Sequence, residues 1–269
     1  MPADYIALSW WQLALAASLM VVSAGVSLAL RLGLHWRLTL ATTRTIAQLL
    51  LLGLVLGWIF EATGTLYVVA VVLLLLVMTL VAGVAAVRRT ERGYPGLLLD
   101  SILAIWASGW MVGAVAVYGV VQVPGEMFAQ YAIPLVGMIL HNTLNGISLG
   151  MDRFGAELTA RRDEVETLLA LGATRWEAAQ EPIRQAVRTG MIPTINTMMV
   201  VGIVSIPGMM TGQLLAGVEP VQAAFYQMAI MFFIAAGASL GTMAVTLLGY
   251  RRLFTADHQF LAARLRKRE

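Results

Sequence analysis

Polar side chains that could take part in chemistry are sparse within the apolar stretches of this 269-residue sequence. Groups of this kind inside a membrane helix usually face a cavity or a partner helix. Imidazole and amide groups, together with thioethers, can bind a transition metal such as Fe(II). A single histidine can instead satisfy one hydrogen bond to a neighbouring helix, so two interpretations of the histidine stay open. The candidates are His141, Asn142, Asn145, Gln48 and Asn196.

The stretch SIPGMMTG, residues 205–212, is a second place where chemistry is expected. Pro207 has no N–H to donate and Gly208 tolerates unusual conformations, so a helix should break here, where protein or water covers the freed carbonyls. Two methionines follow, and the segment is predicted to form a gate or a weak metal site. The alternative is a kinked helix end with methionines as adaptable packing. The candidate metal ligands are His141, Asn142, Met209 and Met210.

The elements that position these groups must lie in a membrane. Hydrophobic residues make up 59% of the sequence, charged residues only 12%, and the mean hydropathy is +0.79, whereas soluble domains carry about 25% charged residues. The absence of cysteine excludes disulfides and thiolate metal ligands. The N-terminal stretch lacks a basic region and a small-residue cleavage site, so we expect a retained membrane span and not a signal peptide.

Helices that cross the hydrocarbon core of a bilayer need about 20 mostly apolar residues. The sequence is therefore predicted to be all-α, a polytopic membrane protein with about seven transmembrane helices. The second begins in the polar sequence TTRTIAQ, and the sixth contains the expected break. The predicted spans are residues 10–30, 43–60, 66–87, 98–121, 129–150, 189–211 and 222–249.

Charge is distributed unevenly between the two sides of these spans. All 18 lysine and arginine residues fall after the first, third, fifth and seventh spans, and basic loops stay in the cytoplasm. The N-terminus is therefore predicted to lie outside and the C-terminus in the cytoplasm, in a multi-pass protein of the cell inner (plasma) membrane. The net charge of +3 reflects this topology, so no nucleic-acid partner is expected. The opposite loops carry only Asp4, Glu61, Glu126 and Glu219.

Residues 155–188 are predicted to form cytoplasmic helices joined by a hinge. Apolar residues spaced i, i+3, i+4 from Val165 give the first helix one apolar face, and Gly172 stands where a left-handed glycine would end it. Thr174 and Glu177 have the spacing of a capping box that starts the next helix. The chain should therefore stop and restart a helix within about three residues.

Two functions fit such a pair of amphipathic helices. It could rest in the lipid headgroups with its arginines toward anionic lipid, or it could dock as a lever into a cytoplasmic partner. Trp176, Ala179 and Ile183 share one face of the second helix, and Pro182 is expected to bend it toward the sixth span. Periodicity alone leaves both functions open.

The run ETLLALGATRW, residues 166–176, resembles the cytoplasmic coupling loop of ABC-transporter permeases, which fits a cleft on a separate ATPase. Most of the sequence is similar to the FetB family of iron-export permeases, most densely from LLALGATRWEAA through VGIVSIPGMMTGQLLAGVEPVQAAFYQ. That family includes the membrane half of a plant aluminium-tolerance transporter. Asn142 matches it and His141 does not, which favours Asn142 as a path residue. The resemblance implies ATPase coupling by Glu166, Leu168, Leu169, Gly172, Ala173, Thr174, Arg175 and Trp176.

ATP hydrolysis through a P-loop needs a glycine-rich turn with a lysine, but the only lysine here is Lys267. No cofactor is expected in this chain, and ATP and Mg would belong to a partner ABC ATPase. The resemblance implies ATP-driven export of iron or a related metal ion by two copies of one permease domain, residues 1–269, in the lipid bilayer. The alternative is a solitary secondary metal transporter or channel. A membrane enzyme is not expected, because the spans offer no suitable catalytic constellation.

Overall fold

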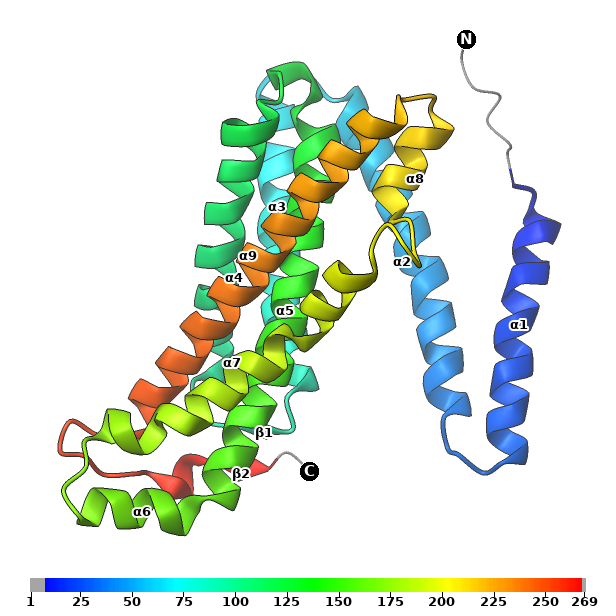
Figure 1. Ribbon diagram of the computed structural model, residues 1–269. Helices are drawn as coiled ribbons and strands as arrows, with labels where there is room; N and C mark the ends of the chain where they lie inside the picture. The colour runs from blue at the N-terminus through cyan, green and yellow to red at the C-terminus, as the bar shows by residue number, and fades with distance from the viewer. Residues whose placement is uncertain (1–7, 268–269) are drawn as a thin grey trace. The chain divides into compact units, whose positions relative to one another are not determined.

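A computed structural model describes residues 8–267, most of which lie in helices (Figure 1). The predicted all-α membrane fold is confirmed, with one pair of two-residue strands as a small exception. The chain divides between Val68 and Val69 into two compact units, and each is described by itself. The expected single permease domain stays a prediction.

The first unit contains a hairpin of two long apolar helices, α1 (Trp10–Ala29) and α2 (His35–Glu61). The turn between them is closed by Ser27, whose hydroxyl oxygen accepts a hydrogen bond from Leu34 N–H at 3.0 Å. Nearly all apolar side chains on both helices are exposed, as expected for helices whose surroundings are hydrocarbon. The polar sequence TTRTIAQ lies inside α2, so this helix begins before residue 43, where the second predicted span starts.

The second unit is a bundle built around one long helix, α5 (Phe128–Ala160). Helix α3 (Gly64–Arg89) begins in the first unit and ends in the second. The other elements are β1 (Arg92–Gly93), α4 (Leu97–Ala114), the π-helical turn η1 (Val115–Val121), the 3-10 turn η2 (Gly125–Met127), α6 (Arg162–Ala170), α7 (Arg175–Val200), α8 (Gly208–Leu215), α9 (Pro220–Leu253), the 3-10 turn η3 (Ala262–Arg264) and β2 (Arg266–Lys267).

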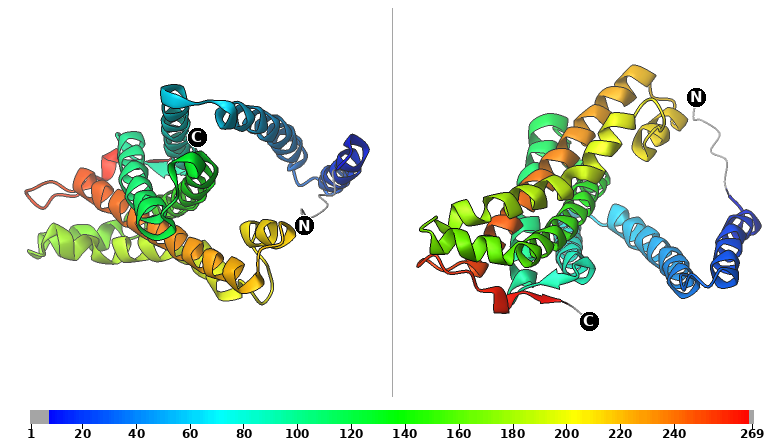
Figure 2. Two further views of the ribbon diagram at one scale, coloured as in Figure 1. Left: turned by 90° about the horizontal axis from the view of Figure 1, so that it is seen from above. Right: turned by 60° about the horizontal axis from the view of Figure 1, so that its bottom comes forward.

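Helix α5 contacts α4, α7 and α9, and Figure 2 shows these helices from two further directions. It meets α7 where glycines leave room for the neighbouring backbone. A side-chain carbon built on Gly190 would lie 2.5 Å from the carbonyl oxygen of Gly146, and one on Gly150 would lie 2.7 Å from a carbon of Thr242 on α9. Small residues let membrane helices approach closely and gain dispersion contacts, so these positions fix the three helices against one another.

Among the described residues, the helices long and apolar enough to cross a membrane are α1, α2, α3, α4 with η1, α5 with η2, and α9. The predicted sixth span, 189–211, is not one continuous helix. Helix α7 starts in the predicted cytoplasmic segment, runs through Pro182 and Pro193, and ends at Val200; α8 then begins at Gly208. The count of seven crossings and the orientation of the termini stay predictions.

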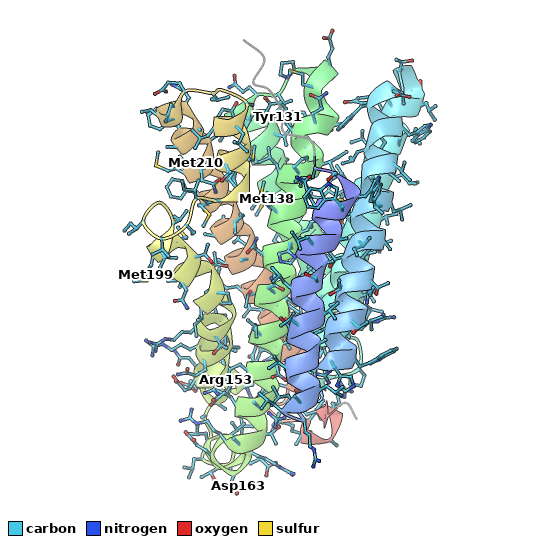
Figure 3. All side chains as sticks on the ribbon, turned by 90° about the vertical axis from the view of Figure 1, so that its right-hand side faces the viewer. Tyr131, Met138, Arg153, Asp163, Met199 and Met210 are labelled. Atoms are coloured by element: carbon cyan, nitrogen blue, oxygen red, sulfur yellow. The ribbon has the colours of Figure 1, made fainter. Side chains whose placement is uncertain are left out.

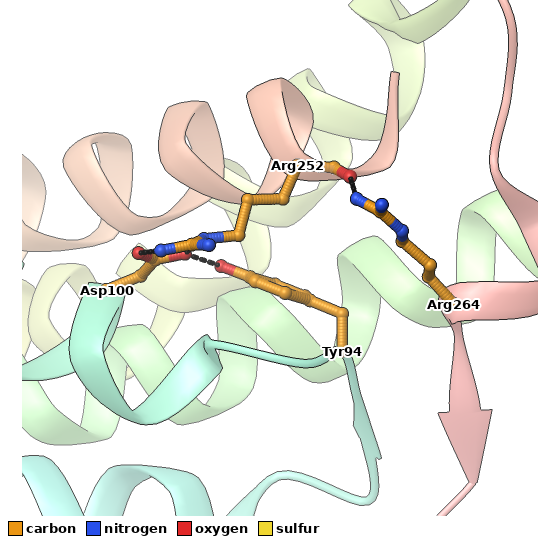
Figure 4. A network of polar contacts seen from close by, with 4 residues as sticks. All are labelled: Tyr94, Asp100, Arg252 and Arg264. Atoms are coloured by element: carbon orange, nitrogen blue, oxygen red, sulfur yellow. Dashed lines mark hydrogen bonds and ion pairs between the residues drawn. The ribbon is translucent and has the colours of Figure 1, made fainter. Parts of the chain in front are cut away.

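A polar network closes the end of the bundle near the β1–β2 pair (Figure 4). The buried Asp100 carboxylate accepts two hydrogen bonds from Arg252, at 2.5 and 2.7 Å, and one from the Tyr94 hydroxyl at 2.9 Å. Arg264 Nη1 donates to the Arg252 carbonyl at 3.0 Å. Burial, reinforced by Asp100, raises the pKa of Tyr94 far above its usual range, so its hydroxyl keeps the proton it donates. The network joins α4, α9 and the C-terminal segment.

Candidate functional site

The predicted break lies between α7 and α8, in residues 201–207, which we call the break segment. Pro207 precedes the first residue of α8, so the interruption expected at Pro207–Gly208 is present. It starts earlier than expected, because α7 already ends at Val200. Gly202 has a φ of +81° and its N–H donates to the Ser205 carbonyl at 2.9 Å. This tight turn, in a run of β-branched residues with low helix propensity, explains the early end.

A cavity of 210 Å³ lies beside the break segment, between α5, α7, α8 and α9. It brings together several residues that the sequence analysis singled out from different stretches. They come from α5 and from the start of α8, which Figure 1 shows leading from the break segment toward the end where α9 begins. The predicted residues that line this first cavity are Asn142, Pro207, Gly208 and Met209.

A second cavity of 410 Å³ adjoins the first one. Met210 lines it, and Pro207, Gln227 and Met231 line both cavities. Figure 3 labels Met138 on α5 and Met210 on α8 in the same part of the bundle, well away from Arg153 and Asp163. Met209 therefore lines the first cavity, and the adjacent Met210 lines the second.

Amide oxygens are the polar groups best placed in these cavities. Asn142 Nδ2 donates to the Met138 carbonyl at 2.9 Å, which fixes the side chain and leaves Oδ1 as its acceptor. Gln227 on α9 is only 7% exposed, and its Oε1 has no hydrogen-bond partner among the described residues. Gln227 was not among the predicted site residues, although a glutamine well inside the apolar run 222–249 was the available signal.

His141 belongs to a different cluster. Its Nε2 lies 3.2 Å from Asn145 Nδ2, and Asn145 Oδ1 accepts a hydrogen bond from Arg89 Nη1 at 2.6 Å. His141 is exposed and lines neither cavity. The four predicted metal ligands are thus not gathered in one place, and the contact of His141 stays within α5, whereas the alternative interpretation expected a hydrogen bond to a neighbouring helix.

Two further predicted path residues also lie outside the cavities. Asn196 is exposed on α7, and Gln48 is exposed on α2 in the first unit. Among the described residues, no group of three or more histidine, aspartate or glutamate side chains could hold a metal ion. A metal bound beside the break segment would therefore depend on amides and thioethers.

The predicted hinge between α6 and α7 is confirmed in its local geometry. Gly172 has a φ of +91°, and its N–H donates to Leu169 O at 3.1 Å. Ala173 N–H donates to Leu168 O at 3.0 Å, which completes a Schellman motif at the end of α6. The carbonyls at the end of α6 therefore find partners within the hinge itself.

The capping box at the start of α7 is also present. Thr174 N–H donates to Glu177 Oε2 at 2.7 Å, and Glu177 N–H donates to Thr174 Oγ1 at 3.3 Å. These hydrogen bonds from Thr174 lower the pKa of Glu177, because they stabilise the carboxylate. Helix α7 therefore begins at a position that its own sequence specifies.

The hinge presents apolar side chains on the outside of the bundle. Leu171 is 80% exposed and Trp176 is 45% exposed, whereas Val165 is buried. Glu166 is exposed and pairs with Arg162 at 2.7 Å. The hinge is therefore accessible both to lipid headgroups and to another protein, the two alternatives predicted from the sequence.

The C-terminal segment supports this surface in a way the sequence analysis missed. Arg175 N–H donates to His258 Nδ1 at 2.9 Å, and Arg175 Nη1 donates to the Thr255 carbonyl at 3.1 Å. The Trp176 ring packs edge-on against Tyr250 at 5.6 Å. Two residues assigned to ATPase coupling, Arg175 and Trp176, are therefore positioned by the end of α9 and the residues after it.

Comparison with known proteins places the chain in a family. It is 40% identical over 230 residues to a UPF0014 membrane protein of Synechocystis, covering 86% of this chain and 88% of that one. It is 31% identical to the "Probable iron export permease protein FetB" of Escherichia coli, over 95% and 96% of the two chains. It is 27% identical to the UPF0014 membrane protein STAR2 of rice, over 91% and 83%.

No solved structure matches the chain. The model of the uncharacterised protein family UPF0014 matches residues 10–254, which is most of the sequence. The protein therefore belongs to the UPF0014 family of membrane proteins.

Proposed function

We propose that this protein is the permease subunit of an ABC transporter that exports iron or a related metal. Two copies would work with two separate ATPase subunits, which hold ATP and Mg, in the cell inner (plasma) membrane. The observation that carries the proposal is the exposed hinge around Gly172, with Leu171 and Trp176 available to a partner. The relative named as an iron export permease supports the cargo and the direction.

Helix α7 offers a mechanical link between the hinge and the cavities. It runs without interruption from Arg175 to Val200, a length of about 39 Å at 1.5 Å per residue. Thr194 and Thr197, near its end, line the first cavity. A partner that displaces the hinge would therefore move one wall of that cavity.

The break segment supports the presence of a second copy. Ile203 is 87% exposed and Val204 is 79% exposed, and the backbone around them is not helical. Non-helical backbone at membrane depth is tolerated only where protein or a water-filled cavity covers it. Apolar side chains favour protein over water, and a second copy of this chain is the cover we propose.

The decisive experiment is purification of the tagged protein from its native membrane, followed by identification of any ATPase bound to it. We expect a Walker-motif ATPase to co-purify and to depend on the hinge for binding. Metal transport by the purified protein in vesicles without any ATPase would support a solitary carrier and overturn the proposal.

The orientation can be tested in the same system, because the chain has no cysteine. A single cysteine introduced by Glu126→Cys in η2 should react with an impermeant maleimide added outside intact cells. One introduced by Arg162→Cys in α6 should react only after the membrane is opened. The reverse pattern would contradict the predicted topology.

A further inference from the structure

The two cavities beside the break segment are rich in thioethers. Six of the 15 methionines in this 269-residue chain line them, and no carboxylate, imidazole or basic group does. The first cavity has Met138 and Met209, the second has Met198, Met210 and Met228, and Met231 lines both. These methionines come from α5, α7, α8 and α9, so sequence proximity does not explain the gathering.

Gln227 places an unpaired acceptor beside these cavities. It lines both cavities, and its side chain is only 7% exposed. Its Oε1 has no hydrogen-bond partner among the described residues. A buried acceptor without a partner costs free energy, so it is normally paired with protein, water or a ligand. The unpaired atom here is an acceptor on a residue that lines both cavities, and the thioethers that share this lining donate no hydrogen bond. A cation would satisfy it.

The ligand chemistry selects the class of cation. Hard divalent cations such as Mg²⁺ and Ca²⁺ take carboxylate oxygens, and none lines these cavities. The cost of removing an ion from water rises steeply with its charge, and neutral ligands offset little of it. Thioethers are soft ligands that select ions such as Cu(I).

We propose that the methionine-lined cavities, with the Gln227 amide oxygen at their junction, bind a soft monovalent metal cation of the Cu(I) and Ag(I) class. The inference goes beyond the proposed function, since it assigns these cavities a cation class different from the iron or related metal proposed as the exported cargo. Met209 and Met231 supply sulfur ligands in the first cavity, and Asn142 Oδ1 lies on the wall of the same space.

Two adjoining sets of weak ligands also suit a transport path. A cation must be held well enough to enter and loosely enough to leave, which several neutral sites achieve better than one tight site. Pro207, at the start of α8, lines both cavities. A shift of α7 or α8 would therefore change the passage from one set of thioethers to the next.

The test is direct binding of silver to the purified protein in detergent, without ATPase. Ag(I) is a stable probe, and the absence of cysteine leaves no thiolate to compete. We expect saturable Ag(I) binding by calorimetry, at least about tenfold tighter than Fe(II) or Zn(II) binding measured anaerobically. Cu(I) affinity, measured by competition with a chromophoric chelator, should likewise exceed the affinities for Fe(II) and Zn(II).

Variants locate the site. The double change Met209→Leu and Met231→Leu keeps volume and apolarity, and should weaken Ag(I) binding by about tenfold or more. Gln227→Leu should weaken it by a smaller factor, and Gln227→Glu should raise the affinity for divalent ions relative to Ag(I). Met199→Leu is the matched control, because Met199 is 72% exposed and lines neither cavity.

Unchanged Ag(I) affinity in the double variant, or Fe(II) binding tighter than Ag(I), would overturn this site. Thermal unfolding of each variant shows whether a loss of binding reflects a loss of fold. Because the measurement uses the chain alone, its failure would leave the proposed ATPase coupling untouched. Conversely, a missing ATPase partner would overturn the proposed function and leave the silver site standing.

Discussion

The two ends of helix α7 are built in opposite ways. At the Arg175 end, reciprocal hydrogen bonds between Thr174 and Glu177, and one from Arg175 N–H to His258 Nδ1, fix the first turn. At the Val200 end, the helix runs into the exposed break segment beside flexible methionines and an unpaired glutamine oxygen. One end is specified by geometry, and the other is left adaptable.

This difference teaches how one helix can serve two roles. A surface that docks with a partner must keep its conformation when the partner moves. Satisfied hydrogen bonds and aromatic packing provide this rigidity at the start of α7. A site that binds and releases cargo must rearrange, and methionines adapt to changing shapes at little cost. The following experiments test this difference between the two ends of α7.

The largest effect is expected from Gly172→Pro. Proline fixes φ near −65° and has no N–H, whereas Gly172 has a φ of +91° and donates to Leu169 O. Coupling of ATP hydrolysis to metal in vesicles containing both subunits should fall by about tenfold or more. Gly172→Asn is the control, because asparagine tolerates the left-handed conformation. Normal coupling with proline would remove the hinge from the mechanism.

A smaller effect should follow Asp100→Asn. The change weakens the Arg252 ion pair and leaves that guanidinium, which is two-fifths exposed, without a carboxylate. We expect a loss of about 2 kcal/mol in unfolding free energy, below the cost for a fully buried pair. Thermal unfolding in detergent measures it, and Ag(I) binding should stay unchanged. A loss of silver affinity would show that the two ends of the bundle are not independent.

Thr174→Ala tests the start of α7 at a scale of about 1 kcal/mol, the usual value for an N-cap. The pH dependence of the stability of this first turn is a more specific test, because it reports on the Glu177 carboxylate. The folded state lowers the pKa of Glu177, so its stabilising contribution is complete at neutral pH and is lost as pH falls through that lowered pKa.

Hydrogen exchange of the first turn of α7, compared between neutral pH and about pH 4, should therefore show acid loosening in the wild type. The same acidification should loosen Glu177→Gln much less, because glutamine has no carboxylate to protonate, whereas Thr174→Ala would keep the backbone N–H that donates to Glu177. Equal acid responses in the wild type and Glu177→Gln would contradict the assigned cause.

The smallest effect is expected from His141→Gln. Glutamine can keep a hydrogen bond to Asn145, and His141 lines neither cavity. Silver affinity should change by less than about twofold. A tenfold loss would return His141 to the cation site and blur the separation between the two clusters.

Local signals allowed the hinge to be predicted from the sequence. A glycine that ends a helix and a threonine three residues before a glutamate act within a few residues of chain, so no knowledge of distant contacts is needed. The break at Pro207 was predicted for the same reason. Its start at Val200 was not, because helix ends depend on contacts as well as on propensity.

Contacts between distant residues could not be predicted. His258 meets Arg175 because the segment after α9 folds back to the start of α7, and Arg252 meets Asp100 because the last turn of α9 packs against α4. The placement of His141 depended on the rotation of α5 about its axis, which turns Asn142 toward the cavity and His141 away from it. The positions of polar residues along a predicted span do not show how the helix is rotated about its axis.

The sulfur lining of the two cavities has a consequence for chemical damage. An oxidant that reaches them converts a methionine thioether to a sulfoxide, which replaces a soft sulfur donor with a polar oxygen. The change also disrupts the packing of the flexible apolar side chains around it. Because six of the 15 methionines line these cavities, peroxide should weaken silver binding there without unfolding the protein, and methionine sulfoxide reductase would be the enzyme able to restore it.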